Sequence, residues 1–102
     1  MPKRPFKRNY EVLWAIGRRL AAARVALEKT QAEISRALGC KPNTWSVYES
    51  GDRMPDPETM ALFADKFGIT TDWVYRGYRG SLPADIARRI PPDSALYNRT
   101  KS

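Results

Sequence analysis

The sequence contains no histidine and a single cysteine, Cys40, among its 102 residues. A zinc finger needs more nitrogen and sulfur ligands than this, and the absence of histidine removes most acid–base and metal chemistry. One cysteine cannot form an internal disulfide, which fits a reducing compartment. The sequence also has no glycine-rich phosphate loop of the P-loop or dinucleotide type. We therefore expect a protein that is not an enzyme and that uses no metal and no cofactor.

Long apolar stretches are absent as well. The longest apolar run, residues 12–17, is far too short for the apolar core of a signal peptide or for a membrane span. The chain has room for one modest domain and no second domain of catalytic size. We expect a cytoplasmic protein without a membrane partner.

Positive charge is abundant and unevenly placed. The formal net charge is +7, whereas residues 30–51 are neutral overall. An excess of positive charge favours a polyanionic partner. Residues 1–9 contain two prolines and no acid, so we expect a flexible basic arm here. Two interpretations stay open: a solubilising tail, or an arm that contacts DNA phosphates through Lys3, Arg4, Lys7 and Arg8.

Residues 30–51 have the pattern of two short helices joined by a tight turn. Thr30 followed by Glu33 forms a capping box, which predicts that a helix starts there. Gly39 provides the left-handed residue that ends this helix at about residue 38. Pro42 suits the first turn of a second helix, and Gly51 ends it. The pattern predicts a helix-turn-helix.

The second of these helices has two different sides. At about 100° per residue, Trp45 and Glu49 share one side with the ring of Pro42, and Tyr48 lies at its edge. The other side carries small residues with amide and hydroxyl groups and one apolar side chain: Asn43, Ser46, Val47 and Ser50. Small polar groups on an exposed helix can approach base edges, so these four are our candidates for reading DNA bases.

Three further helices are predicted around this unit. Asn9 can cap a helix that runs to about residue 28 and carries an apolar stripe, with Arg24 at its edge in need of a carboxylate. Asp56 and Pro57 start a helix that ends at Gly68, and Thr71 caps a short helix, residues 72–76, that ends at Gly77.

We therefore divide the chain into a basic arm, 1–9, a DNA-binding domain, 10–77, and a C-terminal tail, 78–102. Leu82, Ile86 and Ile90 suggest one more short helix over 82–90 before a disordered end. This tail helix either forms an interface with another molecule or packs back on its own domain.

Residues 16–77 resemble the five-helix DNA-binding domain of lambdoid phage repressors and Cro proteins, the XRE-type helix-turn-helix family. The resemblance is carried by an ordered set: Ile16-Gly17-x-x-Leu20 then Arg24, Gln31, Gly39, Glu49 with Gly51, and Gly68-x-x-x-Asp72-Trp73. It implies an all-α fold of five helices, to which the tail adds a candidate sixth. It also implies an ion pair between Arg24 and Glu49, and base readout by the four candidates named above. The residues assigned to phosphate contacts are Thr30, Gln31, Lys41, Thr44 and Arg53, together with the four basic residues of the arm.

Three positions depart from the family pattern. Ser35 stands where an alanine is usual, and we expect its hydroxyl to bond within its own helix. Lys41 replaces the Ser or Thr that usually caps the second helix, which predicts a poorer cap. Pro42 replaces a base-reading glutamine of some relatives, so readout moves toward Asn43 and Val47. Because asparagine pairs with adenine and valine packs on a thymine methyl, we expect a half-site that contains A and T.

The sequence thus predicts a sequence-specific transcriptional regulator, a prophage or bacterial repressor that occupies an operator. We expect it to bind double-stranded DNA with a palindromic operator, as a homodimer at least on DNA. The alternative is an antitoxin-like or adaptor protein whose segment 82–90 binds a protein partner. Unspecific coating of nucleic acid fits the charge but not a neutral, shaped second helix. For Cys40 and for Trp14, Trp45 and Trp73, packing is favoured over redox sensing and base stacking.

Overall fold

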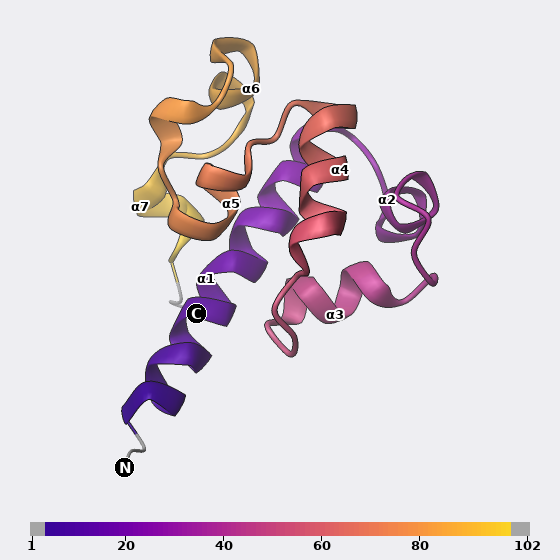
Figure 1. Ribbon diagram of the computed structural model, residues 1–102. Coiled ribbons are helices and arrows are strands. Elements are labelled where there is room, and N and C mark those ends of the chain that lie inside the picture. The colour runs from indigo at the N-terminus through magenta and orange to yellow at the C-terminus, as the bar shows by residue number, and fades with distance from the viewer. Residues whose placement is uncertain (1–3, 99–102) are drawn as a thin grey trace.

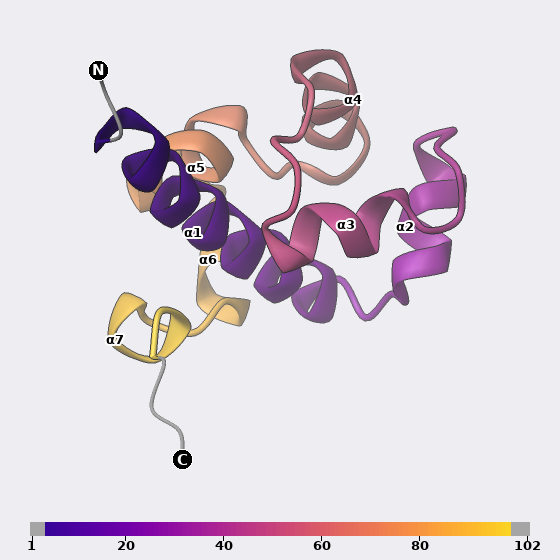
Figure 2. The same ribbon diagram turned by 90° about the horizontal axis from the view of Figure 1, so that it is seen from below.

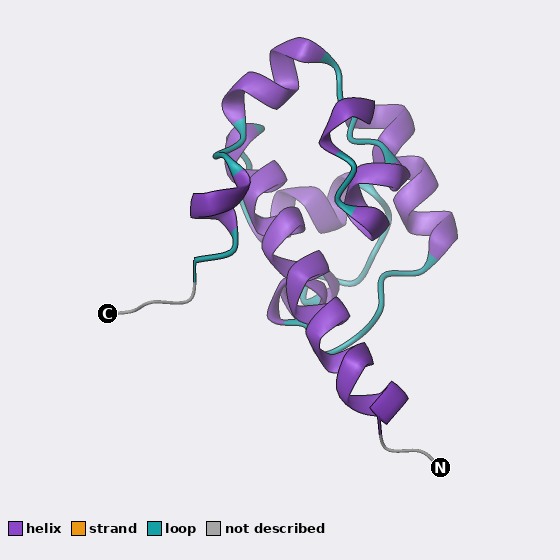
Figure 3. Ribbon diagram, turned by 90° about the vertical axis from the view of Figure 1, so that its left-hand side faces the viewer, coloured by secondary structure: helices purple, strands orange, loops and turns teal. Residues whose placement is uncertain are grey.

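A computed structural model of the chain describes residues 4–98, with side chains from residue 10 onward. Helices and the loops between them make up this part of the chain, which contains no strand (Figures 1 and 3). The expected all-α fold is confirmed. The helices are α1 (Arg4–Ala26), α2 (Gln31–Ala37), α3 (Thr44–Ser50), α4 (Pro57–Phe67), α5 (Thr71–Arg76), the 3-10 helix η1 (Arg79–Ser81), α6 (Ala84–Arg89) and α7 (Asp93–Leu96).

The long helix α1 runs through the middle of the molecule. Figures 1 and 2 show α2 and α3 on one side of it and α7 on the other. One continuous core joins the helices, because α1 contributes apolar side chains to a cluster that every later α-helix also enters. Its buried members are Ile16, Leu20, Ala23, Ile34, Leu38, Trp45, Tyr48, Met60, Phe63, Ile69, Trp73, Val74, Leu82, Ile86, Ile90 and Leu96.

The first helix starts earlier than expected. It begins at Arg4 rather than after Asn9, so the flexible arm predicted for 1–9 is wrong for residues 4–9. Pro5 is compatible with this start, because the first amides of a helix have no intrahelical partner and a missing one costs nothing there. Lys3 lies outside the described residues, and the side chains of Arg4, Lys7 and Arg8 lie outside the described side chains.

The end of α1 uses a non-glycine residue in the left-handed region. The helix stops at Ala26, two residues before the expected end, and Glu28 has a φ of 59°. The amide of Lys29 donates to the carbonyl of Arg24 (3.2 Å) and that of Glu28 to the carbonyl of Val25 (2.9 Å). This is the Schellman pattern, with Glu28 in the place that glycine usually takes.

The caps of α4 and α5 set where these two helices begin. Asp56 caps α4 by accepting a hydrogen bond from the amide of Thr59 (3.3 Å), as predicted. The cap of α5 is Thr70, whose hydroxyl accepts from the amide of Trp73 (3.2 Å), and not Thr71 as expected. Threonine stands at both positions, so the sequence alone did not separate them. Gly68 and Gly77 end these helices as predicted.

The C-terminal segment packs on the same core. Helix α6 lies within the predicted range 82–90, and Leu82, Ile86 and Ile90 are buried. In the structure this segment packs on its own domain, which is one of the two interpretations given above. The disorder expected for the last ten residues is wrong for 93–98, because α7 forms there and its Leu96 is only 3% exposed.

Arginines of α1 hold the end of this segment in place. The Nε of Arg18 donates to the carbonyl of Leu96 (3.2 Å), and the Nε of Arg19 donates to the hydroxyl of Tyr97 (2.7 Å). The ring of Tyr97 also lies 6.4 Å from that of Trp14, centroid to centroid. None of the helices within residues 4–98 is long and apolar enough to cross a membrane.

Candidate nucleic-acid interface

The start of α2 is fixed by the predicted capping box. The hydroxyl of Thr30 accepts from the amide of Glu33 (3.1 Å), and the carboxylate of Glu33 accepts from the amide of Thr30 (2.8 Å). The bond from the Thr30 amide lowers the pKa of Glu33. Because the Thr30 hydroxyl acts as an acceptor in the box and the residue is exposed, its own hydrogen stays available to donate to an anion.

The turn between α2 and α3 differs from the expected one. Helix α3 begins at Thr44, not around Pro42, and the amide of Thr44 donates to the carbonyl of Lys41 (3.0 Å). Asn43 has φ and ψ of −94° and 4°, the values of the third residue of a type I turn in which Pro42 is the second. Proline suits that turn position as well as a first helical turn. For this reason the sequence predicts the start of α3 two residues too early. The cap residue is therefore Asn43 and not Lys41.

A serine of α2 takes over the capping of α3. The side chain of Asn43 makes no capping hydrogen bond. Instead the fully buried hydroxyl of Ser35 accepts from the amide of Trp45 (3.2 Å), in the first turn of α3. The bond within its own helix that we expected for Ser35 is thus replaced by one between helices. Since first-turn amides lack intrahelical partners, this bond fixes α3 relative to α2.

The two sides of α3 have the predicted character. Trp45 and Tyr48 are buried, and the ring of Trp45 lies 4.9 Å from that of Phe63 on α4. The four candidate base-reading residues lie on the solvent side, where Asn43 and Ser50 are exposed and Ser46 and Val47 are partly exposed. Pro42, expected on the buried side, is exposed because it precedes the helix.

Local hydrogen bonds already use the two serine hydroxyls. Ser46 donates to the carbonyl of Asn43 (2.9 Å), and the hydroxyl of Ser50 lies 2.9 Å from the carbonyl of Val47 and 2.8 Å from the carboxylate of Asp52. Each hydroxyl can still accept a hydrogen bond, but it donates to a new partner only by giving up a local one. Asp52 stands only two residues from Ser50, but the sequence pattern does not predict that its carboxylate takes up this hydroxyl.

An ion pair ties α1 to α3 behind this surface. The Nε of Arg24 donates to Oε2 of Glu49 (2.6 Å) and its Nη2 to Oε1 (3.3 Å), so the predicted pair is present. The side chains are 21% and 9% exposed, respectively. Arg24 also donates through Nη1 to the carbonyl of Lys29 (3.0 Å), which joins the pair to the loop before α2.

Gln31 completes this network, which the sequence did not predict. Its Nε2 donates to Oε1 of Glu49 (2.9 Å). The amide therefore has one N–H held by Glu49, and its second N–H and its carbonyl oxygen are directed elsewhere by that bond. One carboxylate of α3 thus receives hydrogen bonds from α1 and α2, and it fixes the orientation of a predicted phosphate contact.

A close helix crossing makes the network possible. A Cβ atom on Gly17 would lie 2.4 Å from the carbonyl oxygen of Glu49 and 2.9 Å from that of Tyr48. Real Cβ atoms do not approach backbone atoms so closely, so any larger residue would push α1 and α3 apart. Gly17 belongs to the motif that carried the family resemblance, but the pattern alone did not show why glycine is required.

The other predicted phosphate contacts lie around the helix-turn-helix. Lys41 and Arg53 are exposed at either end of α3, and Thr44 is partly exposed in its first turn. The nearby thiol of Cys40 is partly buried, and burial raises its pKa, which disfavours the reactive thiolate. This agrees with the packing role we favoured for it.

Fold and surface thus define a helix-turn-helix protein, and comparison with known proteins agrees. Residues 17–80 match the family described as "Helix-turn-helix domain", which is more than half of the chain. The chain belongs to this family. It is also 37% identical over 57 residues to the cryptic phage CTXphi transcriptional repressor RstR of Vibrio cholerae serotype O1. The aligned part is 56% of this chain and 51% of that protein, so the chain matches about half the length of this curated relative. No solved structure shows significant similarity to the chain. The resemblance to XRE-type proteins is confirmed.

Proposed function

We propose that the protein is a sequence-specific DNA-binding transcriptional regulator that represses by occupying an operator. The observation that carries this proposal is the helix pair α2–α3. Its outer side offers small polar groups to solvent, while Ser35 and the Arg24–Glu49–Gln31 network hold it rigidly from behind. The similarity of the chain to a phage transcriptional repressor supports repression rather than activation.

In this proposal α3 lies in the major groove. Asn43 bonds an adenine edge, since its side chain is exposed and makes no cap bond, and Val47 packs on a thymine methyl. Ser46 and Ser50 accept hydrogen bonds from bases or exchange their local bonds for new ones. The preferred half-site then contains A and T.

The phosphate contacts surround α3 in the same arrangement. Gln31 is oriented by its hydrogen bond to Glu49, and Thr30 keeps a hydroxyl hydrogen to donate. Lys41, Thr44 and Arg53 lie next to the ends of α3. The N-terminal end of the chain adds the positive charges of Lys3, Arg4, Lys7 and Arg8. Because these contacts neutralise phosphates without reading bases, they supply affinity that falls as salt rises.

Two copies are required for useful specificity, since one short helix covers only a few base pairs. On a palindromic operator the two α3 helices would lie about 34 Å apart, one turn of DNA. We place the dimer surface away from the apolar side chains of 82–90, since Ile86 in α6 and Ile90 directly after it are buried in their own domain. For the same reason we do not favour the adaptor alternative, which needs these side chains to be exposed to a partner. Because its proposed target is DNA, we also propose that the protein is cytoplasmic.

Footprinting on the DNA upstream of its own gene tests the proposal. We expect one protected segment with two symmetric halves whose centres are about one helical turn apart. Scrambled DNA of the same composition is the control and should give no discrete protection. Uniform protection of both DNAs, or protection of neither, would contradict sequence-specific repression.

A further inference from the structure

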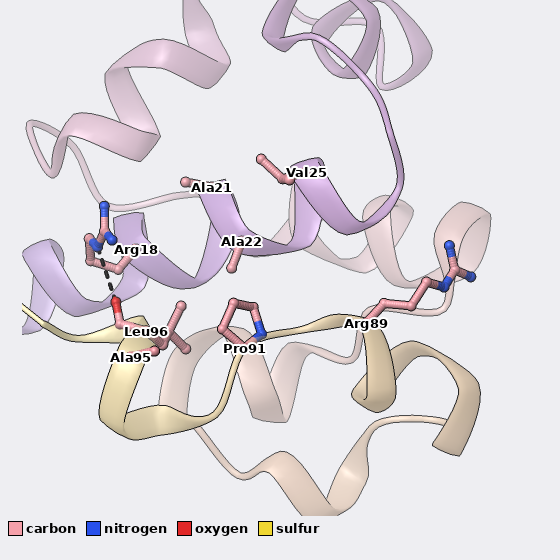
Figure 4. A pocket seen from close by; sticks show the side chains of 8 residues that line it. All are labelled: Arg18, Ala21, Ala22, Val25, Arg89, Pro91, Ala95 and Leu96. Carbon is pink, nitrogen blue, oxygen red and sulfur yellow. Dashed lines mark hydrogen bonds between the residues drawn. The ribbon is translucent and has the colours of Figure 1, made fainter.

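A groove runs along α1 on the side that faces away from α3. It lies between α1 and the segment that joins α6 to α7, and it has a volume of about 350 Å³. Figure 4 shows its two walls, and Figures 1 and 2 place α7 and α3 on opposite sides of α1. The residues that line it are Arg18, Ala21, Ala22, Val25, Arg89, Pro91, Ala95 and Leu96.

The floor of the groove is apolar because six of its eight lining residues are alanine, valine, proline or leucine. Three alanines leave space that larger residues would fill, and Val25 stands at the edge with 63% of its surface exposed. Concave sites of about 300 to 1,000 Å³ with apolar walls and a few polar groups are typical binding sites. This groove is at the lower end of that range.

Its polar groups are two exposed arginines. The Nε of Arg18 donates to the carbonyl of Leu96 (3.2 Å), and Nη1 of Arg89 donates to the carbonyl of Ala26 (3.0 Å). Each guanidinium is thus held by one backbone bond and keeps further N–H groups for a ligand. None of the eight lining residues is a carboxylate. Arg18 belongs to α1, and Arg89 is bonded to α1 at Ala26. These two positions are about 12 Å apart along the helix at 1.5 Å per residue.

The charge decides between the candidate occupants. A second copy of this chain carries a net charge of +7 and would bring its own arginines to a basic groove. A DNA backbone would satisfy the arginines but leave the apolar floor without a partner. An apolar segment with carboxylates at both ends complements the floor and the arginines together.

We propose that this groove binds an extended apolar segment of a partner protein whose two carboxylates are about four residues apart, which spans roughly 13 Å at 3.3 Å per residue. The groove includes Arg89 but none of the apolar side chains Leu82, Ile86 and Ile90 on which the predicted interface over 82–90 rested. The inference does not depend on DNA binding. Since the groove and α3 face opposite ways, the protein holds such a partner and DNA at the same time.

A labelled peptide, Glu-Leu-Val-Leu-Glu, tests this with the full chain in a fluorescence anisotropy titration up to about 1 mM. The same peptide with glutamine at both ends should bind about tenfold more weakly, because charge-assisted hydrogen bonds are lost. Val25→Glu places a negative charge at the edge of the groove, where it should repel the carboxylates of the peptide and abolish binding. Val12→Glu is the matched control, an exposed valine of the same helix outside the groove, and should bind like the parent.

A second variant guards against a folding defect. Arg18→Gln keeps a donor for the Leu96 carbonyl and should also weaken the glutamate peptide about tenfold while leaving the glutamine peptide unchanged. Equal binding of both peptides, no saturable binding of either, or full binding by Val25→Glu would overturn the proposal. If sedimentation shows that the parent is a dimer and that Val25→Glu is a monomer, the groove binds a second copy of the chain. If Val25→Glu loses operator binding, the groove binds DNA. Either result would overturn the proposal.

Discussion

Glu49 has the most constrained environment of the charged residues in the helix-turn-helix. It is nearly buried, and its carboxylate receives hydrogen bonds from Arg24 on α1 and from Gln31 on α2. Family resemblance predicted the first of these partners. The second became visible only in the folded chain, because whether two long side chains meet depends on rotamers and helix positions that no spacing encodes.

Removing this carboxylate should strand the guanidinium of Arg24. We expect Glu49→Ala to lower the free energy of unfolding by about 3 kcal/mol, as for a partly buried pair that loses one member. Glu49→Gln should lose less, because its carbonyl oxygen can still accept from Arg24 and Gln31. Denaturant midpoints measure both, with the exposed carboxylate of Asp65, replaced by alanine, as the control. An unchanged midpoint for Glu49→Ala would show that the pair contributes nothing.

At the scale of elements, local caps were predictable and competing ones were not. The capping box at Thr30 and the cap at Asp56 have one candidate each, and both are confirmed. Where two residues could serve, as with Thr70 and Thr71, the local sequence pattern does not separate them. Pro42 is the clearest case, since its fixed φ suits a type I turn and a first helical turn equally.

Ser35 shows how one helix can stabilise the start of another. Ser35→Ala would leave the buried amide of Trp45 without its acceptor, and we expect a loss of about 1 kcal/mol of stability. Ser46→Ala, on the exposed side of α3, is the matched control and should lie within about 0.5 kcal/mol of the parent. Thermal unfolding followed by circular dichroism compares them. If both serines have the same effect, the cap between α2 and α3 is not significant.

At the scale of the molecule, five helices and their core followed from the sequence, but the packing of the C-terminal segment did not. A four-residue helix such as α7 has no periodicity to detect, and the burial of Leu96 depends on a surface of α1 more than seventy residues earlier. The candidate reading residues lie on the solvent side of α3, as expected, because Trp45 and Tyr48 fix which side faces inward. Their contacts with bases remain predictions.

The central claim is that α3 reads DNA sequence while the surrounding residues supply affinity. Binding titrations of Asn43→Ala and Lys41→Ala against operator and scrambled DNA, across a salt series, test it most directly. Asn43→Ala should lose about 1 to 3 kcal/mol on the operator only, with an unchanged salt slope. Lys41→Ala should weaken binding to both DNAs alike and reduce the slope of log K against log salt concentration by up to about 0.9. If Asn43→Ala weakens binding to both DNAs equally, α3 is not the reading helix and the proposed function is wrong.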